Sequence, residues 1–172
     1  GMDMNRFLRL LAIGIALFVA LPTFAAEKIT LLYVPVNAYV TSYVAKDQGF
    51  FARHGLDVEL KIVPAGGQSI ASLMADSAQI ATTTPTQLLQ ANEQGFDIVA
   101  VGGGTAFPVG PGTNGVLAKT GSGIKAPADL TAKKVGIPGL GSTQELLPKL
   151  WLRANGIDER KVQWIEVQFP QL

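Results

Sequence analysis

The sequence contains no cysteine and only one histidine among its 172 residues. Without cysteine there can be no disulfide bond, no thiolate nucleophile and no lipid-anchored cysteine, so the fold must be stabilised by its core. The sequence also lacks an excess of charge of either sign, since it has 14 lysines and arginines and 13 aspartates and glutamates. This balance offers no basic surface for nucleic acid or for an anionic membrane, and we expect no nucleic-acid partner.

The sequence also lacks an apolar run of the length needed to cross a bilayer. Its longest apolar stretch covers residues 10–21, well short of the roughly 20 residues of a membrane-spanning helix. Arg6 and Arg9 precede this stretch and small residues follow it, which is the plan of a secretory signal peptide. We predict a signal peptide over residues 1–25, cleaved after Ala25, and a periplasmic location. A retained membrane anchor is the alternative.

What is present is an alternation of strand-like and helix-like segments from residue 28 to residue 104. Apolar, β-branched runs predict strands, and apolar residues at helical spacing predict helices. The strands are expected at 28–35, 57–64, 79–84 and 97–104, and the helices at 38–55, at 66–77 and from Pro85 onward. This order is typical of an α/β fold in which helices cover a parallel sheet.

A second α/β unit follows a segment rich in glycine and proline. We predict lobe 1 at 26–104, a crossing segment at 105–114 and lobe 2 at 115–172. In lobe 2, strands are expected at 115–119, 134–139 and 162–167, and helices at 128–130 and 142–155. Three strands and one long helix cannot cover both faces of a parallel sheet. We therefore expect lobe 2 to be incomplete and the sequence to be the N-terminal part of a longer protein; a small complete domain with an irregular tail is the alternative.

The candidate binding residues lie where the predicted strands end and the helices begin. Ligands of open α/β sheets bind beyond the carboxyl ends of the strands. The turns at these positions carry small, hydroxyl-bearing or amide-bearing residues and no charge, so they offer N–H groups and positive helix ends to polar or anionic groups. The candidate ligand-binding residues are Asn37, Tyr39, Thr41, Ser42, Gly66, Gly67, Gln68, Thr83, Thr84, Thr86, Gly141, Ser142 and Thr143.

The turn before the last long helix nearly matches a nucleotide-binding loop. Gly136 and Gly141 have the spacing of G-x-x-x-x-G-K-[ST], but Ser142 stands at the lysine position. Without that lysine we do not expect hydrolysis of a nucleoside triphosphate, and we predict instead a binding turn from Gly141 to Thr143. Ser142 and Glu145 also have the spacing of a capping box, so a purely structural role is the alternative.

Catalytic patterns are absent from the sequence. His54 falls at the end of a predicted helix, where a cation is favourable for the helix dipole. No nucleophile with a base and an orienting group can be assembled, and no metal-ligand spacing occurs. We therefore predict a binding protein with no enzymatic activity, no cofactor and no metal.

The segment GFFARHGLDVELKIVPAGGQSIASLMADSAQIATTTPTQLLQANEQGFDIVAVG (49–102) resembles the substrate-binding proteins of ABC importers for nitrate, sulfonate and taurine, a family that includes binders of thiamine and riboflavin precursors. The later motifs GVLAKTGSGIKAPADLTAKKVGIPGLGST (115–143) and LRANGID (152–158) extend this likeness to about residues 28–168. One departure is Ser77 with Gln79–Ile80, where the family commonly has Gly and Ile-Asp.

The resemblance implies a type II periplasmic-binding-protein fold, in which two α/β lobes close on a small solute and deliver it to an ABC permease at the inner membrane. It places ligand contacts on 37–42, 66–68, 83–86 and 141–143. The absence of arginine and lysine from these turns argues against a compact anion held by an ion pair, but a sulfonate held by amides and hydroxyls remains open. A thiamine-pyrimidine-synthase-like enzyme on the same fold and a ligand-sensing domain are the alternatives.

Overall fold

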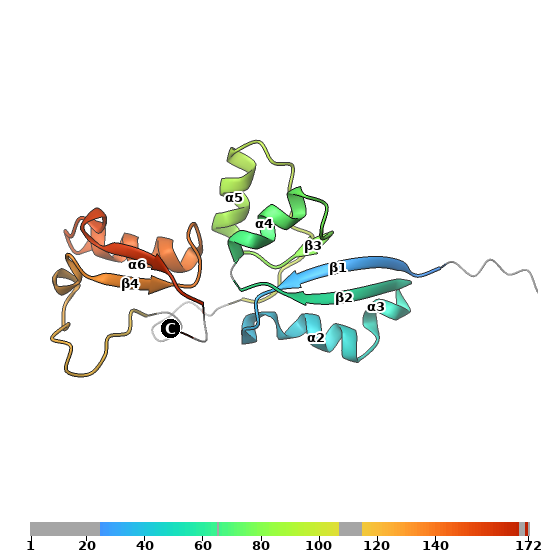
Figure 1. Cartoon of the computed structure of the whole chain (residues 1–172), viewed down its shortest axis with the longest axis horizontal. Coiled ribbons are helices and arrows are strands. Elements are labelled where there is room, and N and C mark those ends of the chain that lie inside the picture. The colour runs from blue at the N-terminus through green and yellow to red at the C-terminus, as the bar shows by residue number, and fades with distance from the viewer. Residues whose placement is uncertain (1–24, 65, 107–114, 169–170, 172) are drawn as a thin grey trace, which may run out of the picture.

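A computed structural model describes residues 25–64, 66–106, 115–168 and 171 of the chain. These residues form two α/β units (Figure 1), for which we keep the names lobe 1 and lobe 2. The predicted signal peptide lies outside the described residues except for Ala25, and so does most of the predicted crossing segment. Across the parts that the structure describes, no helix combines the length and the apolar character that a bilayer crossing requires.

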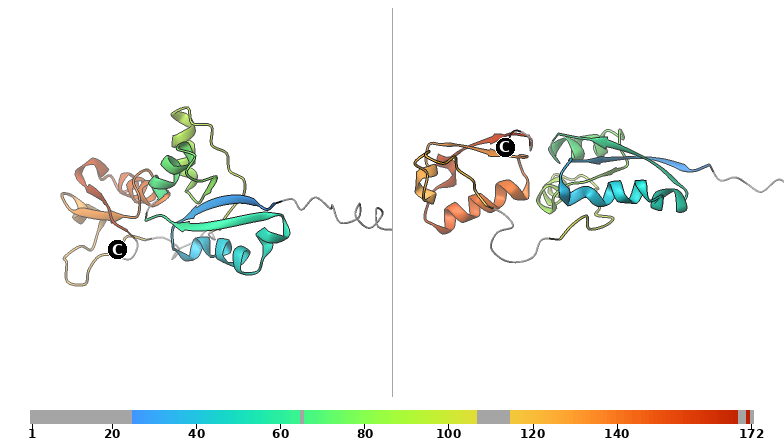
Figure 2. Two further views of the ribbon diagram at one scale, coloured as in Figure 1. Left: turned by 45° about the vertical axis from the view of Figure 1, so that its right-hand side comes forward. Right: turned by 90° about the horizontal axis from the view of Figure 1, so that it is seen from below.

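Lobe 1 is built on a parallel sheet of three strands. β1 (Glu27–Tyr33) lies between β2 (Leu56–Ile62) and β3 (Ile80–Ala81). α2 (Val40–Asp47) and α3 (Phe50–Arg53) lie on one face of this sheet, and α4 (Gly66–Met74) and α5 (Pro85–Glu93) lie on the other (Figures 1 and 2). The predicted parallel α/β architecture is confirmed.

The core of lobe 1 consists of two clusters, one on each side of β1. Leu31 and Tyr33 pack with Val58 on one side, and Leu32 packs with Ala78 on the other. Successive side chains of a strand point to opposite faces of the sheet. The unbroken apolar run of β1 is therefore explained by helices on both faces.

The prediction of one continuous helix over residues 38–55 is wrong. The segment is divided into the 3-10 helix η1 (Asn37–Tyr39), α2 and α3. Gly49 separates α2 from α3 with a φ of 69°. This left-handed conformation is accessible to glycine without a steric penalty, and it interrupts the helical hydrogen bonding.

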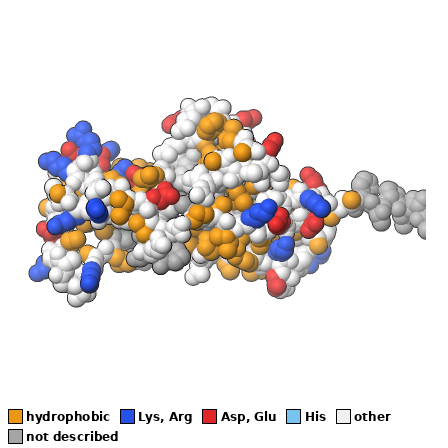
Figure 3. Space-filling view, in the orientation of Figure 1, with side chains coloured by type: hydrophobic (Ala, Val, Ile, Leu, Met, Phe, Trp, Pro, Cys, Tyr) orange, Lys and Arg blue, Asp and Glu red, His pale blue; other side chains and the backbone are white. Residues whose placement is uncertain are grey.

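The predicted strands at 97–104 and 115–119 are also wrong. Neither segment pairs with a strand in the described part of the chain, and Val101 and Leu117 are 78% and 95% exposed. Figure 3 shows hydrophobic side chains on the surface of both lobes. β-branched residues favour a strand only where a neighbouring strand and a packed face are available, so the local pattern was insufficient here.

Lobe 2 contains the two parallel strands β4 (Lys134–Ile137) and β5 (Gln163–Glu166). The helix α6 (Thr143–Ala154) connects them, together with η3 (Glu159–Lys161), and η2 (Pro127–Leu130) precedes β4. Leu152 of α6 is fully buried between Leu130 and Val162, which anchors the helix on the strand pair. The predicted strands at 134–139 and 162–167 and the predicted helix at 142–155 are confirmed with slightly shorter bounds.

Candidate functional site

The two lobes meet where α5 and α6 begin. α5 follows β3 and α6 follows β4, so both helix starts lie at the carboxyl ends of strands. Thr86 Oγ1 and Thr143 Oγ1 lie 2.9 Å apart and form a hydrogen bond between the lobes. Both threonines were predicted as ligand-binding residues, and the structure brings them into direct contact.

Gln87 also forms a hydrogen bond between the lobes. Its Nε2 donates to the carbonyl oxygen of Leu140 across 3.4 Å. Its Oε1 accepts hydrogen bonds from Thr83 Oγ1 at 3.0 Å and Thr84 Oγ1 at 3.3 Å. Gln87 is only 6% exposed, so both ends of its amide are used inside the protein.

Sequence reasoning missed Gln87, although a signal for it exists. Thr84 and Gln87 are three residues apart at the start of α5, which is the spacing of a capping box. Thr84 Oγ1 does accept the N–H of Gln87 at 3.4 Å. The side chain of Gln87 instead bonds to the hydroxyls of Thr83 and Thr84 and to Leu140 of the other lobe. The three-residue spacing of Thr84 and Gln87 does not indicate these contacts.

The turn that begins α6 is held by two carboxylates. Gly141, at a φ of 73°, donates its N–H to Glu145 Oε2 at 2.5 Å. Leu140 donates its N–H to Glu166 Oε2 at 3.0 Å. Glu145 also forms an ion pair with Lys149 one turn further along α6.

The predicted capping box at Ser142 is therefore wrong. The N–H of Ser142 donates to the carbonyl of Gly139 at 3.3 Å, so the amide that a capping box requires is already used. Glu145 accepts from Gly141 instead, and the Ser142 side chain makes no capping hydrogen bond. Ser142 is 4% exposed, and its Oγ has no hydrogen-bond partner among the described residues.

Tyr39 lies beside the start of α5. Its hydroxyl donates to the carbonyl of Thr83 at 3.5 Å. Its ring lies against Gly104, where a Cβ would be 3.6 Å from the ring. Burial raises the pKa of the Tyr39 hydroxyl, so at neutral pH this group is an uncharged donor.

The other predicted binding residues are not joined to this inter-lobe contact by hydrogen bonds within the described part of the chain. They lie in η1, in α2 and at the start of α4. They are Asn37, Thr41, Ser42, Gly66, Gly67 and Gln68. Their role in binding stays a prediction. Ser69 in α4 was not predicted, yet it is fully buried and its Oγ is without a partner in the described residues.

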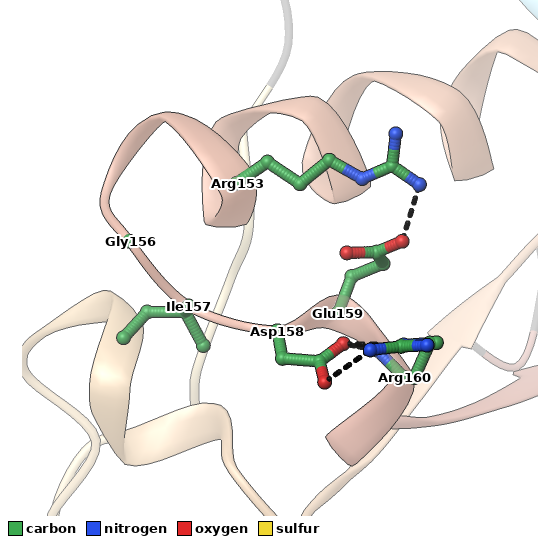
Figure 4. Close-up of a pocket in the computed structure, with 6 residues that line it drawn as sticks. All are labelled: Arg153, Gly156, Ile157, Asp158, Glu159 and Arg160. Carbon is green, nitrogen blue, oxygen red and sulfur yellow. Dashed lines mark hydrogen bonds and ion pairs between the residues drawn. The ribbon is translucent and has the colours of Figure 1, made fainter.

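A separate surface hollow lies at the other end of α6 (Figure 4). Arg153 forms an ion pair with Glu159, and Arg160 Nε lies 2.9 Å from Asp158 Oδ1. Hydrogen bonds from Arg160 lower the pKa of Asp158 to about 2. Because these charges pair with one another, the hollow offers a solute little free charge. In the described residues, no group of three or more histidines, aspartates or glutamates could hold a metal ion.

Known proteins from several bacteria are similar to this chain. A Haemophilus influenzae protein named as a thiamine biosynthesis protein is 32% identical over 171 residues, covering 96% of this chain and 52% of its own length. The formylaminopyrimidine-binding protein of Halalkalibacterium halodurans is 27% identical over 143 residues, covering 83% of this chain and 42% of its own length. The periplasmic aliphatic sulphonate binding protein SsuA of Escherichia coli has a TM-score of 0.55 at 21% identity, over 83% of this chain and 47% of SsuA.

The chain therefore spans about half the length of the relatives that it matches. The likeness to SsuA shows the fold, which is that of the periplasmic binding proteins, and the chain covers a part of it. The family model described as NMT1/THI5 like matches residues 37–172, which is most of the sequence. The chain belongs to the NMT1/THI5-like family.

Proposed function

We propose that the protein is the periplasmic solute-binding component of an ABC importer, which captures a small solute between two lobes and presents it to a permease at the inner membrane. The observation that carries this proposal is the hydrogen bond between Thr86 and Thr143. It joins two helix starts at the carboxyl ends of strands in different lobes, which is where α/β sheets bind ligands. Export through the predicted signal peptide, residues 1–25, is part of the proposal.

The chemistry of the contact supports a mechanism in which the lobes open and close. The contact includes hydrogen bonds between uncharged groups, each contributing only about 0.5–1.5 kcal/mol. Thr86, Thr143 and Gln87 can exchange these hydrogen bonds for others to a solute or to water. A solute that bonds to both lobes would favour the closed arrangement, in the manner of hinge closure around a ligand.

The solute is proposed to be small and organic or oxyanionic. A sulfonate, nitrate, taurine or a molecule like a vitamin precursor fits this description. The name of the Escherichia coli protein supports a sulfonate, and the name of the Halalkalibacterium protein supports a pyrimidine precursor. Backbone N–H groups, hydroxyls and the Gln87 amide would recognise either kind of solute by hydrogen bonding.

An enzyme of thiamine biosynthesis is a second candidate, because the Haemophilus influenzae relative carries that name. His54 is the natural base to examine, and it is exposed at the end of α3. A general base must lie within hydrogen-bond reach of the reacting group. The proposed site is the contact between Thr86 and Thr143, and His54 is not part of that contact. We therefore expect binding without turnover. Replacement of His54 by asparagine should leave solute binding unchanged.

The test begins with the protein expressed from the complete reading frame that contains this sequence. Native mass spectrometry of this protein from its own compartment would identify a co-purified solute. Calorimetry would then compare the parent with the double variant Ser142→Ala, Thr143→Ala. We expect the affinity to fall by roughly 10- to 100-fold, as for the loss of one or two hydrogen bonds to a ligand.

The matched control is the double variant Thr120→Ala, Ser122→Ala. It removes the same two kinds of hydroxyl from an exposed loop of lobe 2 that precedes η2, and its affinity should equal that of the parent. An unchanged affinity in the Ser142→Ala, Thr143→Ala variant would remove this turn from the site.

A further inference from the structure

Lobe 2 carries apolar and basic side chains on surfaces that the contact between the lobes does not use. We propose that the outer face of α6 and the amino ends of β4 and β5 dock the protein on a membrane of anionic phospholipid. This proposal goes beyond solute binding, because it concerns where the protein is held. It can therefore fail without affecting the proposed function.

The helix α6 has large apolar residues on two opposite sides. On one side Leu152 packs against the strand pair. On the other side lies an outer stripe, formed at helical spacing by four residues that are between 41% and 46% exposed: Leu146, Leu147, Leu150 and Trp151. A helix that packs one face on a sheet normally turns a polar face to solvent. The outer stripe departs from this rule and is available to an apolar partner.

Charge is distributed unevenly between the lobes. The near balance over the whole sequence predicts no basic surface for a membrane, but lobe 2 has eight lysines and arginines against five aspartates and glutamates, a net charge of +3. Lobe 1 has four against seven, a net charge of −3. Figure 3 shows Lys and Arg side chains around the outer end of lobe 2. An anionic surface would attract lobe 2 and repel lobe 1.

Three exposed lysines form a cluster where β4 and β5 begin. Lys133 and Lys134 stand at the start of β4, and Lys161 is the last residue of η3, close before β5. The backbone holds them together, since Ala132 donates its N–H to the carbonyl of Lys161 at 2.8 Å and Gln163 donates to that of Lys133 at 2.9 Å. Within the described residues, none of these lysines is in an ion pair. Their charge is free to act on an anionic surface.

An anionic bilayer fits the outer stripe and the lysine cluster better than a second copy of the chain does. Interfacial helices bury Leu and Trp at the boundary between headgroups and acyl chains, and their lysines attract anionic lipids. Four side chains that are less than half exposed supply far less than the roughly 800 Å² per partner of a standard protein interface. A second copy would also bring together two lobes of charge +3, and like charges oppose association.

The test measures how the protein from its complete reading frame binds vesicles in a sedimentation titration. Vesicles of phosphatidylcholine and phosphatidylglycerol in equal parts are the anionic probe, and vesicles of phosphatidylcholine alone are the neutral one. The parent should bind the anionic vesicles more tightly, and added salt should weaken this binding by screening the charges. Brominated acyl chains should quench the fluorescence of the parent more than that of Trp151→Phe, because Trp151 lies in the outer stripe.

Two double variants examine the two surfaces separately. Leu147→Gln, Leu150→Gln makes the outer stripe polar and should weaken binding to the anionic vesicles about tenfold, because less apolar surface leaves water. Lys133→Gln, Lys134→Gln removes two charges from the lysine cluster and should weaken the same binding by roughly 10- to 30-fold. If circular dichroism shows that the leucine variant is unfolded, the lysine variant carries the test.

The matched controls lie in lobe 1. Val40→Gln, Val44→Gln makes the same kind of change in α2, where the two side chains are 52% and 49% exposed. Lys28→Gln, Lys61→Gln removes two exposed lysines. Both controls should bind the anionic vesicles as the parent does.

Each outcome supports or overturns docking on a membrane. A parent that binds anionic vesicles no better than neutral ones overturns it, and so do lobe 2 variants that bind like their lobe 1 controls. Light scattering provides a further outcome: a parent that is dimeric, does not bind vesicles and becomes monomeric in Leu147→Gln, Leu150→Gln would assign the outer stripe to a second copy. Solute affinity should be the same in all four variants, so the proposed function is judged separately.

Discussion

β1 of lobe 1 and β4 of lobe 2 are both short apolar strands, yet they are buried to different extents. Leu31 to Val34 are all buried around the end of β1, whereas Ile137 is the only buried residue of β4. β1 has a paired strand on each edge and helices on both faces, while β4 pairs with β5 alone. α6 correspondingly leaves Leu147 and Leu150 more than two-fifths exposed. The comparison shows that burial depends on the neighbours of a strand more than on its own sequence.

The largest expected effect is a loss of stability in lobe 2 that leaves lobe 1 unchanged. Leu152→Ala removes the fully buried side chain of lobe 2 and should lower the free energy of unfolding of that lobe by about 2–5 kcal/mol. Both tryptophans, Trp151 and Trp164, lie in lobe 2. Urea unfolding followed by tryptophan fluorescence therefore reports lobe 2.

The control for this prediction is Leu31→Ala in lobe 1. It should shift unfolding followed by far-ultraviolet circular dichroism and leave the tryptophan midpoint in place. Equal shifts of the tryptophan midpoint in both variants would show that the lobes unfold as one unit, which would contradict a difference between them.

A smaller effect is expected at the contact that joins the lobes. Gln87→Ala leaves the hydroxyls of Thr83 and Thr84 without their acceptor and should destabilise lobe 1 by about 1–3 kcal/mol. Gln90→Ala, one turn away and exposed, should change stability by less than about 0.5 kcal/mol. Thermal unfolding by circular dichroism measures both. Equal effects would mean that the buried amide of Gln87 contributes nothing specific.

The smallest effect is a pH dependence confined to lobe 2. Hydrogen bonds from Arg160 lower the pKa of Asp158 from 3.8 to about 2 in the folded protein. A lowered carboxyl pKa stabilises the folded state above its unfolded value, and this contribution is lost as the pH falls from about 4 to about 2. The tryptophan midpoint should fall over this window, and less so in Asp158→Asn. An identical pH dependence in the variant would assign the change to other groups.

The sequence predicted the architecture where local pattern and long-range pairing agree. β1 and β2 have apolar, β-branched residues and also pair with each other in register, so their prediction succeeded. Residues 97–104 carry a similar pattern but have no strand beside them in the described chain. Strand pairing joins residues far apart in sequence, and a local pattern contains no information about whether the partner is there.

Part of the contact between the lobes could be anticipated from local pattern, and part could not. Hydroxyls at the carboxyl ends of strands identified Thr86 and Thr143, which are 57 residues apart and in contact. The capping box predicted that Glu145 accepts the N–H of Ser142, whereas it accepts the N–H of Gly141. Spacing alone does not reveal that Gly141 is left-handed or that the Ser142 N–H already donates to the carbonyl of Gly139. Whether these residues bind the solute stays a prediction.

The missing side chain at Gly141 leaves room for the end of the Gln90 side chain of α5 beside the turn that begins α6. A Cβ at this position would lie 2.5 Å from Gln90 Oε1, and a φ of 73° is strained for any residue other than glycine. A larger residue would require Gln90 to swing aside and the backbone of the turn to rearrange. Exchange of Gly141 therefore acts mainly on the left-handed turn, because the exposed Gln90 side chain can move aside whereas the positive φ is strained for any other residue.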